Sequence, residues 1–577
     1  YSWIADQFAF VLGGERLFAR HLFSAGLPDD DAYFREVLQP ADCDFDASSR
    51  GEYESVAAAI GPFLDRAMAE ITWRRYGAVG FTTAFQQTMA SLCLARRIRT
   101  EAPGVKILFG GAACEGEMGR ELIRCFPDID YIFLGNADHA FPDVVEQILR
   151  GGPVQLPPGV VEQAGPNEPL PAERNSAQVE RQEEACMVED LDGLPFPNFD
   201  DYFTRLERSP LRSQITPLLF AETSRGCWWG QRRQCVFCGL NGTTLTFRAK
   251  GARRALDELR HLADRYGVRH FALADNILDH RYFDSLMPML RDAGIGLTFE
   301  YEMRTRLSRE QVDLLASAGV GAAQLGVESF STPILRRLHK GTRALDNLQT
   351  LKWLTEAGVE LKWNLLWGIP GEDPDEYRVM AELLPAIVHF APPIAVGQVR
   401  ADRFSPYFCQ PAQYGIENLR PHRAFRFVYP LPDESLQRLA YYFEHDFADG
   451  RDPQHYIEPW LDAVEQWQND HHRATLSASF QEDGALVLSD TRPCAAGFQH
   501  RLSGLERELY VYCDRGRRFG DLRHFAQEVV PDASPDETAL HRLLSDWLDA
   551  RLMLLIDGHY LALALRLRTG AARKASS

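Results

Sequence analysis

Six short apolar segments alternate with helical patterns between residues 216 and 402. This alternation constrains the fold most, because consecutive parallel strands need helical crossovers, and right-handed crossovers curl successive units in one direction. The pattern predicts a partial (β/α)6 barrel over residues 206–430, with its reactive groups at the carboxyl ends of the strands. The expected strands lie near residues 216–222, 268–274, 297–303, 321–328, 360–367 and 394–400.

A second α/β pattern precedes this region and is confined to the first 150 residues. After a helical N-terminal segment, apolar strands near 78–82, 105–109 and 131–134 alternate with helices near 86–101 and 117–125. Such a rhythm predicts an open parallel sheet with helices on both faces, a doubly wound Rossmann-like domain over residues 1–150.

The remaining segments differ from both α/β regions. Residues 151–205 are rich in Pro, Gly, Gln and Glu, which is typical of a linker. Residues 431–577 predict helices near 434–449 and 457–468, a hairpin at 475–488, three further helices and a closing strand pair. We therefore expect an α+β, winged-helix-like module there, with a disordered tail from residue 566.

Composition excludes several classes of protein. The formal charge of −19 and the pI near 5.4 disfavour a nucleic-acid partner, because polyphosphate is repelled at long range. No apolar run is long enough to span a bilayer, so we expect no membrane partner. The 11 cysteines in 577 residues are too sparse for a disulfide scaffold, and nothing at the N-terminus resembles an export signal. These features predict a cytoplasmic protein.

Three cysteines, Cys227, Cys235 and Cys238, lie within twelve residues just after the first predicted barrel strand. A structural zinc site requires four tetrahedral ligands, so zinc would need a distant fourth ligand such as Cys186 or Cys409. Purely structural thiols are a further alternative. A four-iron cluster held by three cysteines instead leaves one iron open for a small ligand. We favour the iron–sulfur interpretation, since the loop opens a predicted barrel.

Four stretches together resemble the cobalamin-dependent radical S-adenosylmethionine maturases of ribosomally synthesised peptides, many of which are C-methyltransferases. They are residues 227–242, 271–278, 324–330 and 366–372. The resemblance covers roughly residues 75–410 and is most specific in the cysteine loop. The first cysteine gap departs from the common C-x3-C-x2-C spacing, because seven residues that include Trp228 and Trp229 separate Cys227 from Cys235.

The resemblance implies that the three cysteines bind a [4Fe-4S] cluster and that S-adenosylmethionine binds beside it. Its methionine part would meet the loop after Cys238 and the third strand, its ribose the fourth strand, and its adenine a glycine turn. The implied residues are Gly239, Leu240, Asn241, Glu302, Arg304, Glu328, Ser329, Gly368 and Gly371. For each single polar residue, as for Asp275 and Asn276, a hydrogen bond inside the barrel is the alternative.

The resemblance also implies that the N-terminal α/β domain binds cobalamin. The residues expected to line the slot for its nucleotide tail are Thr82, Thr83, Gly110, Gly111 and Gly135. No Asp-x-His-x-x-Gly motif occurs, so we expect no histidine ligand on the lower face of cobalt. Cys114 in the same region is interpreted as a buried thiol.

The implied activity is modification of a ribosomally made precursor peptide, most simply methylation of an unactivated carbon through a 5′-deoxyadenosyl radical and methylcobalamin. An external electron donor would be required, and the C-terminal module at 475–566 is a candidate for holding the peptide's leader by strand addition. Two alternatives stay open. One is a maturase of the same fold that catalyses cyclisation, oxidation or rearrangement. The other is a cobalamin- or metal-binding regulatory protein.

Overall fold

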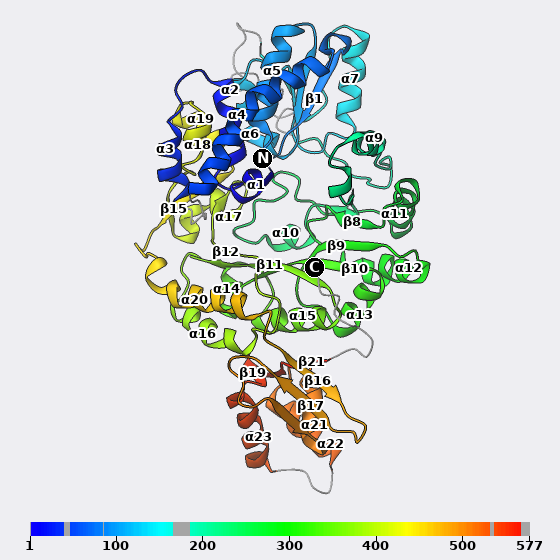
Figure 1. Cartoon of the computed structure of the whole chain (residues 1–577), viewed down its shortest axis with the longest axis vertical. Helices are drawn as coiled ribbons and strands as arrows, with labels where there is room; N and C mark the ends of the chain where they lie inside the picture. The colour runs from blue at the N-terminus through cyan, green and yellow to red at the C-terminus, as the bar shows by residue number, and fades with distance from the viewer. Residues whose placement is uncertain (1, 40–46, 85, 165–184, 531–535, 567–577) are drawn as a thin grey trace. The chain divides into compact units, whose positions relative to one another are not determined.

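The computed structural model describes residues 2–39, 47–84, 86–164, 185–530 and 536–566 (Figure 1). These residues form two compact units, and each unit is assembled from separate stretches of chain. The first contains Tyr1–Asp190, Phe237–Leu245 and Arg400–Asp449, and the second contains Leu191–Val236, Thr246–Val399 and Gly450–Ser577. The disordered tail that the sequence predicts from residue 566 lies almost entirely outside the described residues.

The second unit is built around a six-stranded parallel sheet in the order β12-β11-β10-β9-β8-β5. Every strand neighbours the next one in sequence, as successive right-handed crossovers require. The sheet is open, with β5 and β12 as its edges, so the predicted partial (β/α)6 barrel is confirmed. Its strands are β5 (Leu219–Ala221), β8 (His270–Leu273), β9 (Thr298–Met303), β10 (Val320–Glu328), β11 (Glu360–Trp367) and β12 (Ala395–Gln398).

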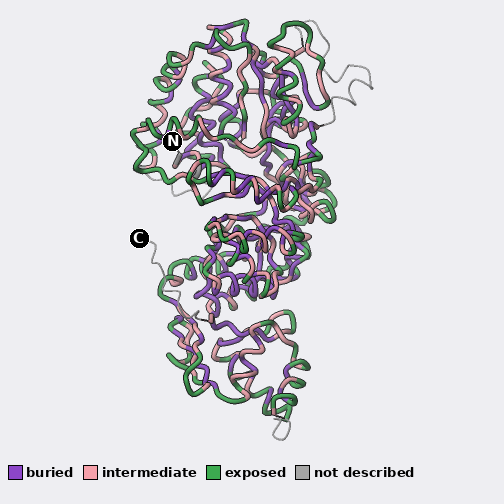
Figure 2. The backbone as a smooth tube through the Cα atoms, turned by 90° about the vertical axis from the view of Figure 1, so that its right-hand side faces the viewer, coloured by how far each residue is buried: buried purple, intermediate pink, exposed green. Residues whose placement is uncertain are grey.

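Helices cover one face of this sheet and leave the other face polar. On β9 and β11 every second residue is buried, and Glu302 and Lys362 are among the partly exposed residues between them. Figure 2 shows buried, intermediate and exposed residues along the backbone of the whole chain. Successive side chains of a strand point to opposite faces, so these polar groups share the inner surface of the barrel. The crossover helices are α11 (Ala252–Tyr266), α12 (Leu286–Ala293), α13 (Arg309–Ser317), α14 (Thr332–Arg337), α15 (Ala344–Glu356) and α16 (Asp375–Leu383).

The C-terminal part of the second unit contains the predicted winged-helix-like arrangement. Three helices, α21 (Gly504–Tyr512), α22 (Phe519–Val529) and α23 (Glu537–Asp549), are followed by the antiparallel hairpin of β19 (Met553–Ile556) and β20 (His559–Ala562). A four-stranded sheet adjoins them. It contains β18 (Gln499–Leu502), β17 (Leu486–Asp490), β16 (Leu476–Phe480) and β21 (Leu565–Arg566), and β16 and β17 form the predicted hairpin.

This module is joined to the barrel by apolar and ionic contacts. The helix α20 (Gln454–Asp470) packs through Trp467 onto Phe330 and Trp363, with the two indole rings 5.5 Å apart. The ammonium group of Lys352 on α15 is buried and pairs with Asp514, which follows α21. A buried pair of this kind is costly to break, since the remaining partner would stay charged in the interior.

The first unit contains a four-stranded sheet in the order β1-β2-β3-β4. β1 (Ala78–Thr82), β2 (Lys106–Gly110) and β3 (Tyr131–Phe133) are parallel and coincide with the predicted strands, and the helices α5 (Thr88–Glu101), α6 (Gly116–Cys125) and α7 (Ala140–Arg150) flank them. The α/β fold class is therefore confirmed. The described strands follow one another in chain order, without a reversal of strand order.

β4 (Val160–Glu162) lies in the segment that composition predicts to be a linker. It pairs antiparallel with β3, and Gly135 forms a bridge with Cys186 farther along the same segment. Parts of residues 151–205 therefore extend the sheet by backbone pairing. The Pro-rich composition of this segment does not predict such pairing.

The helix predicted at 434–449 is wrong beyond Leu439. α19 (Asp433–Leu439) ends there, and β15 (Tyr442–Phe447) forms the centre of a three-stranded antiparallel sheet between β13 (Ala401–Asp402) and β14 (Ile416–Pro421). Pairing with strands distant in sequence decides this conformation, and local periodicity does not report such pairing.

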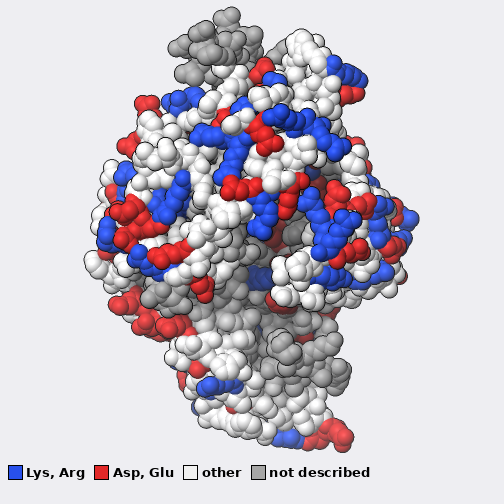
Figure 3. Space-filling model, turned by 45° about the horizontal axis from the view of Figure 1, so that its top comes forward, with Lys and Arg blue, Asp and Glu red and all other residues white. Residues whose placement is uncertain are grey.

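On the face shown in Figure 3, basic and acidic side chains are interspersed rather than separated into fields of one sign. None of the helices that the structure describes is long and apolar enough to cross a membrane.

A buried carboxyl group ties the N-terminal helices to the sheet of the first unit. Glu15 on α2 (Gly13–Leu22) accepts hydrogen bonds from the backbone N–H groups of Thr88 (2.9 Å) and Met89 (2.6 Å), at the first turn of α5. Burial raises the pKa of Glu15 to about 7, although these hydrogen bonds oppose the shift. The partial positive charge at the N-terminus of α5 partly stabilises the ionised form of Glu15.

The raised pKa of Glu15 predicts a pH-dependent stability. The folded protein holds this proton more tightly than the unfolded chain, so the stabilisation is complete below about pH 4.5 and is lost as pH rises through 7. Between pH 5 and 8 the free energy of unfolding of the wild type should fall by on the order of 2 kcal/mol more than that of Glu15→Gln. Urea titrations at both pH values measure this difference. The control Glu70→Gln, on an exposed residue of α4 (Ala47–Glu70), should follow the wild type.

Candidate active site

The cysteine loop is anchored at its start by a buried aspartate. Asp275, directly after β8, accepts hydrogen bonds from the Thr223 backbone N–H (2.6 Å), the Thr223 hydroxyl (2.5 Å) and the Ser224 hydroxyl (2.8 Å). Burial raises the pKa of Asp275 to about 6. Tyr282 donates a further hydrogen bond to the Thr223 carbonyl (3.0 Å). Asp275 therefore holds the chain that leads into Cys227, which favours the structural alternative for this residue.

A short helix fills the seven-residue gap between the first two cysteines. α10 (Trp228–Arg233) begins directly after Cys227, whose sulfur accepts a hydrogen bond from the Gly230 N–H at 3.3 Å. The indole N–H of Trp228 donates to the Leu278 carbonyl (3.1 Å), and that of Trp229 donates to the His339 carbonyl (3.0 Å). The unusual spacing is thus a packed element attached to two barrel loops.

The ring of Trp229 lies between a glycine and an arginine. Gly341 has a φ of +67°, and a Cβ there would lie 2.2 Å from the ring carbon Cη2. The guanidinium of Arg304 lies 3.9 Å from the centre of the same ring and also donates to the Lys340 carbonyl. Arg304, which the resemblance assigns to S-adenosylmethionine, is engaged here in holding the cysteine loop.

Two cations flank Cys235. Burial raises the pKa of its thiol, and the positive charges of Lys340 and Arg304 oppose that shift. Burial alone would lower the pKa of Lys340, but Glu328, whose carboxylate lies 3.1 Å from the ammonium, and Cys235 outweigh it and raise the pKa. Buried cations beside a thiol stabilise its anionic form. The two cations therefore offset part of the cost of a thiolate at Cys235. The sequence reasoning did not anticipate Lys340.

The predicted contacts on β9 and β10 face different environments. Burial, together with the charges of Asp275 and Glu300, raises the pKa of Glu302 to about 7, and its carboxyl group has no hydrogen-bond partner among the described residues. Glu302 is therefore free to meet a ligand in the barrel. Ser329 is buried, contacts the Met380 sulfur at 3.3 Å and accepts a hydrogen bond from the Ser331 N–H. Its hydroxyl belongs to the helix layer, so the structure offers no support for its predicted ribose contact.

The glycine turn after β11 is closed by a residue that sequence reasoning did not assign to the site. Gly368 and Gly371 both have positive φ, 72° and 71°. The buried Glu372 accepts hydrogen bonds from the Ile369 N–H (2.8 Å), the Tyr377 hydroxyl (2.5 Å) and the Tyr456 hydroxyl (2.7 Å). The turn is therefore held rigidly with its backbone close to the barrel rim.

In the first unit, Cys238 begins a loop held by residues far away in sequence. A Cβ on Gly239 would lie 2.0 Å from the Arg403 carbonyl oxygen, so only glycine fits there. Glu115 accepts hydrogen bonds from the Thr243 N–H (2.8 Å) and hydroxyl (3.1 Å). Asn241 takes a left-handed conformation with φ of 68°, and Leu240 is half exposed. Arg403 and Glu115 are supports that the sequence did not reveal.

Several of the predicted cobalamin residues meet at the carboxyl ends of β1 and β2. Thr83 is fully buried and donates its hydroxyl to the Gly110 carbonyl at 3.0 Å. A Cβ on Gly111 would lie 2.4 Å from the Thr83 carbonyl oxygen, and one on Gly135 would lie 2.7 Å from the Cys186 carbonyl oxygen. These glycines are thus required by the packing of the chain itself. Thr82 is exposed, and Cys114 is a buried thiol as predicted.

A zinc site would need a fourth ligand beside the three cysteines. Among the described residues, no group of three or more His, Cys, Asp or Glu side chains is arranged to hold a metal ion. Cys186, a suggested fourth ligand, is buried and donates its thiol to the Pro158 carbonyl at 3.2 Å. The assignment of the cluster to Cys227, Cys235 and Cys238 stays a prediction.

Residues 221–384 match the family model of the radical SAM superfamily, so this part of the chain is a radical SAM domain. The match begins at the last residue of β5 and ends just after α16, and so spans the cysteine loop and the four barrel strands from β8 to β11.

Curated relatives carry methyltransferase names. The chain is 20% identical over 336 residues to an uncharacterized methyltransferase of Pyrococcus horikoshii, covering 57% of this chain and 67% of the relative. It is 26% identical over 373 residues to cytidylyl-2-hydroxyethylphosphonate methyltransferase of Streptomyces wedmorensis, covering 56% and 66%. The chain thus spans about two thirds of the length of these relatives.

Solved structures share the fold. The cobalamin-dependent radical enzyme OxsB, with aqua-cobalamin bound, matches with a TM-score of 0.53 at 13% identity, over 72% of this chain and 66% of that one. The methyltransferase TsrM from Kitasatospora setae, with cobalamin and a [4Fe-4S] cluster bound, matches with a TM-score of 0.50 at 16% identity, over 71% and 83%. At these identities the likeness establishes the fold. The family match supports the predicted S-adenosylmethionine and iron–sulfur cofactors.

The contact between Gly341 and Trp229 predicts a specific effect on cluster binding. Gly341→Ala should push the indole and α10 aside and lower the iron retained after anaerobic reconstitution severalfold. Gly358→Ala is the matched control, because Gly358 also has a positive φ (77°), but a Cβ added there would meet no other atom within 4 Å. Iron and sulfide analysis of both variants measures the effect, and equal iron contents would show that Trp229 does not position the loop.

Proposed function

We propose that the protein is a cobalamin-dependent radical S-adenosylmethionine methyltransferase that modifies a carbon of a ribosomally made peptide. One observation supports the proposal of a cobalamin-dependent radical S-adenosylmethionine enzyme. A radical SAM domain follows an α/β sheet domain, in a chain whose fold matches an enzyme solved with cobalamin bound. The methyltransferase names of the curated relatives favour methyl transfer.

The cofactors would supply the difficult chemistry: an electron from the cluster, a radical from S-adenosylmethionine and a methyl group from cobalamin. The protein's residues would hold and shield them. Cys227, Cys235 and Cys238 supply the thiolates, and Lys340 balances negative charge beside Cys235. Glu302 offers an unpartnered carboxyl group to the ammonium of S-adenosylmethionine. An external donor would deliver the electron.

The peptide substrate follows from the resemblance of the motifs and from the module that accompanies the barrel. The module at 475–566 provides the three helices and the hairpin β19–β20, so it offers strand edges to an extended leader. The net charge of −19 disfavours a nucleic acid. The name of the phosphonate methyltransferase shows that a relative acts on another kind of substrate, so the test must include product analysis.

The test is anaerobic reconstitution with iron, sulfide and cobalamin, followed by incubation with S-adenosylmethionine, a strong reductant and a candidate precursor peptide. Mass spectrometry should show 5′-deoxyadenosine and a peptide heavier by one methylene unit. Single Cys227→Ala, Cys235→Ala and Cys238→Ala variants should lose 5′-deoxyadenosine formation to background. Cys409→Ala should retain it, because Cys409 is exposed and lies outside the loop.

The outcomes separate the alternatives. 5′-Deoxyadenosine with a modified but unmethylated peptide would favour cyclisation, oxidation or rearrangement over methylation. Absence of both 5′-deoxyadenosine and cluster absorbance would contradict the enzymatic proposal and favour the regulatory protein.

A further inference from the structure

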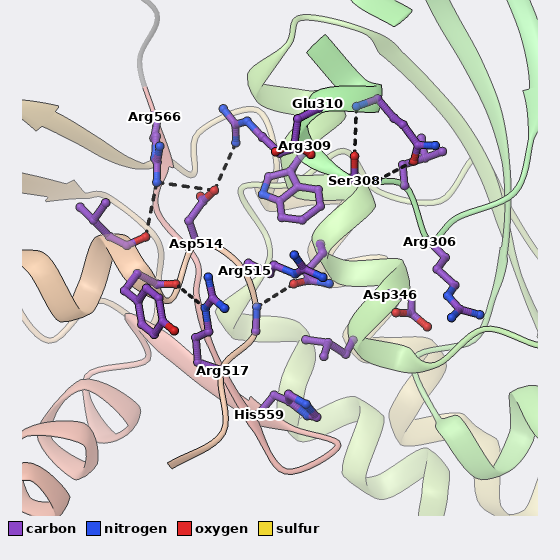
Figure 4. A pocket seen from close by; sticks show the side chains of 18 of the residues that line it. Arg306, Ser308, Arg309, Glu310, Asp346, Asp514, Arg515, Arg517, His559 and Arg566 are labelled. Carbon is purple, nitrogen blue, oxygen red and sulfur yellow. Dashed lines mark hydrogen bonds and ion pairs between the residues drawn. The ribbon is translucent and has the colours of Figure 1, made fainter. Parts of the chain in front are cut away.

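The second unit contains a cavity of about 720 Å³ between the barrel helices and the winged-helix-like module (Figure 4). One wall comes from the loop after β9, the first turn of α13 and the helix α15 as far as Trp353. The other comes from α21 and the loop after it, from α22 and from the hairpin β19–β20. Its volume lies in the range of pockets that bind ligands. None of the predicted cofactor residues lines it.

The charge of the cavity contrasts with that of the chain. Six arginines line it against four carboxylates, although the whole chain carries a net charge of −19. Some of these charges neutralise one another, since Asp514 meets Arg309 and Arg566, each at 3.5 Å. Arg306 and Arg515 extend into the space from the two opposite walls (Figure 4), and neither guanidinium has a hydrogen-bond or ion-pair partner among the described residues.

An unpartnered donor lies in the same wall. Trp353 on α15 lines the cavity and is 3% exposed, yet its indole N–H has no hydrogen-bond partner in the described part of the chain. A buried polar group without a partner is costly, so such donors are usually satisfied by a ligand or by water. Both arginines are exposed, so together with this buried N–H they offer a bound ligand donors and positive charge that suit oxygen acceptors and negative charge.

The cavity also adjoins the cysteine loop through two short stretches of chain. Arg304, whose guanidinium lies over Trp229, is two residues from Arg306, and Lys340, beside Cys235, is three residues from Arg343 at the cavity. Two or three residues span at most roughly 7 to 10 Å. An extended chain bound in the cavity therefore has only a short distance to cover to reach the barrel rim.

We propose that this cavity binds a carboxylate-bearing segment of the peptide substrate, with Arg306 and Arg515 holding its acidic side chains and Trp353 donating to one of its oxygens. The proposal rests on the proposed function in naming the occupant as peptide. Arginine matches carboxylates bidentately. The apolar lining of Leu307, Leu345 and Phe525 suits an acidic peptide, whose carboxylates are carried on apolar side-chain carbons, better than a phosphate group.

The test measures binding of a fluorescein-labelled octaglutamate peptide to the full-length protein by fluorescence anisotropy, without cofactors or turnover. We expect saturable binding that Arg306→Glu with Arg515→Glu weakens at least tenfold and that Trp353→Phe weakens severalfold. The matched control reverses two exposed arginines away from the cavity, one on the barrel and one in the module, Arg253→Glu with Arg542→Glu. It changes the net charge equally and should leave binding unchanged.

Two further measurements test whether the cavity binds carboxylate side chains in particular. A labelled octaglutamine peptide should bind at least tenfold more weakly than octaglutamate, and millimolar inorganic phosphate should not displace the acidic peptide. Equal binding of both peptides, equal loss in the control variant, or arginine-dependent binding of phosphate alone would overturn the proposal. Because no step requires catalysis, failure of methylation and failure of docking are separate results.

Discussion

The start of the cysteine loop is held by the hydrogen bonds that Asp275 accepts from the Thr223 backbone N–H and from the hydroxyl groups of Thr223 and Ser224. All three groups are buried, and a buried polar group destabilises the fold unless its hydrogen-bond partners are in place. Because Cys227 follows Ser224 by three residues, the position of the first thiol depends on the end of β8. The start of the loop is therefore fixed, and the helix α10 follows directly after Cys227.

The inserted helix α10 explains how the long gap between Cys227 and Cys235 is kept ordered. Each tryptophan of α10 donates its N–H to a barrel carbonyl, and Trp229 packs where only glycine at position 341 leaves space. Close packing of α10 therefore orders the cysteine loop, although the first two cysteines lack the common short spacing. Two stretches that hold α10 also lead to the arginine-lined cavity, because Arg304 is two residues from Arg306 and His339 is four residues from Arg343.

Glycines have a similar role in the first unit. Gly111, Gly135 and Gly239 each lie against a backbone carbonyl that a Cβ would overlap. The packing of the chain itself therefore accounts for glycine at these three positions. The predicted cobalamin contacts therefore retain a physical alternative in which the glycines serve the fold alone.

The sequence by itself determined the α/β class, the six barrel strands and the cysteine loop, because strand periodicity and the clustering of thiols are local properties. It did not reveal β4 within the supposed linker or β15 within the supposed helix, since both are stabilised by pairing with distant strands. Only the tertiary structure decided that Arg304 holds Trp229, that Ser329 faces the helix layer and that Lys340 lies beside Cys235. Each of these depends on which loops the barrel brings together, and that proximity is absent from any local pattern.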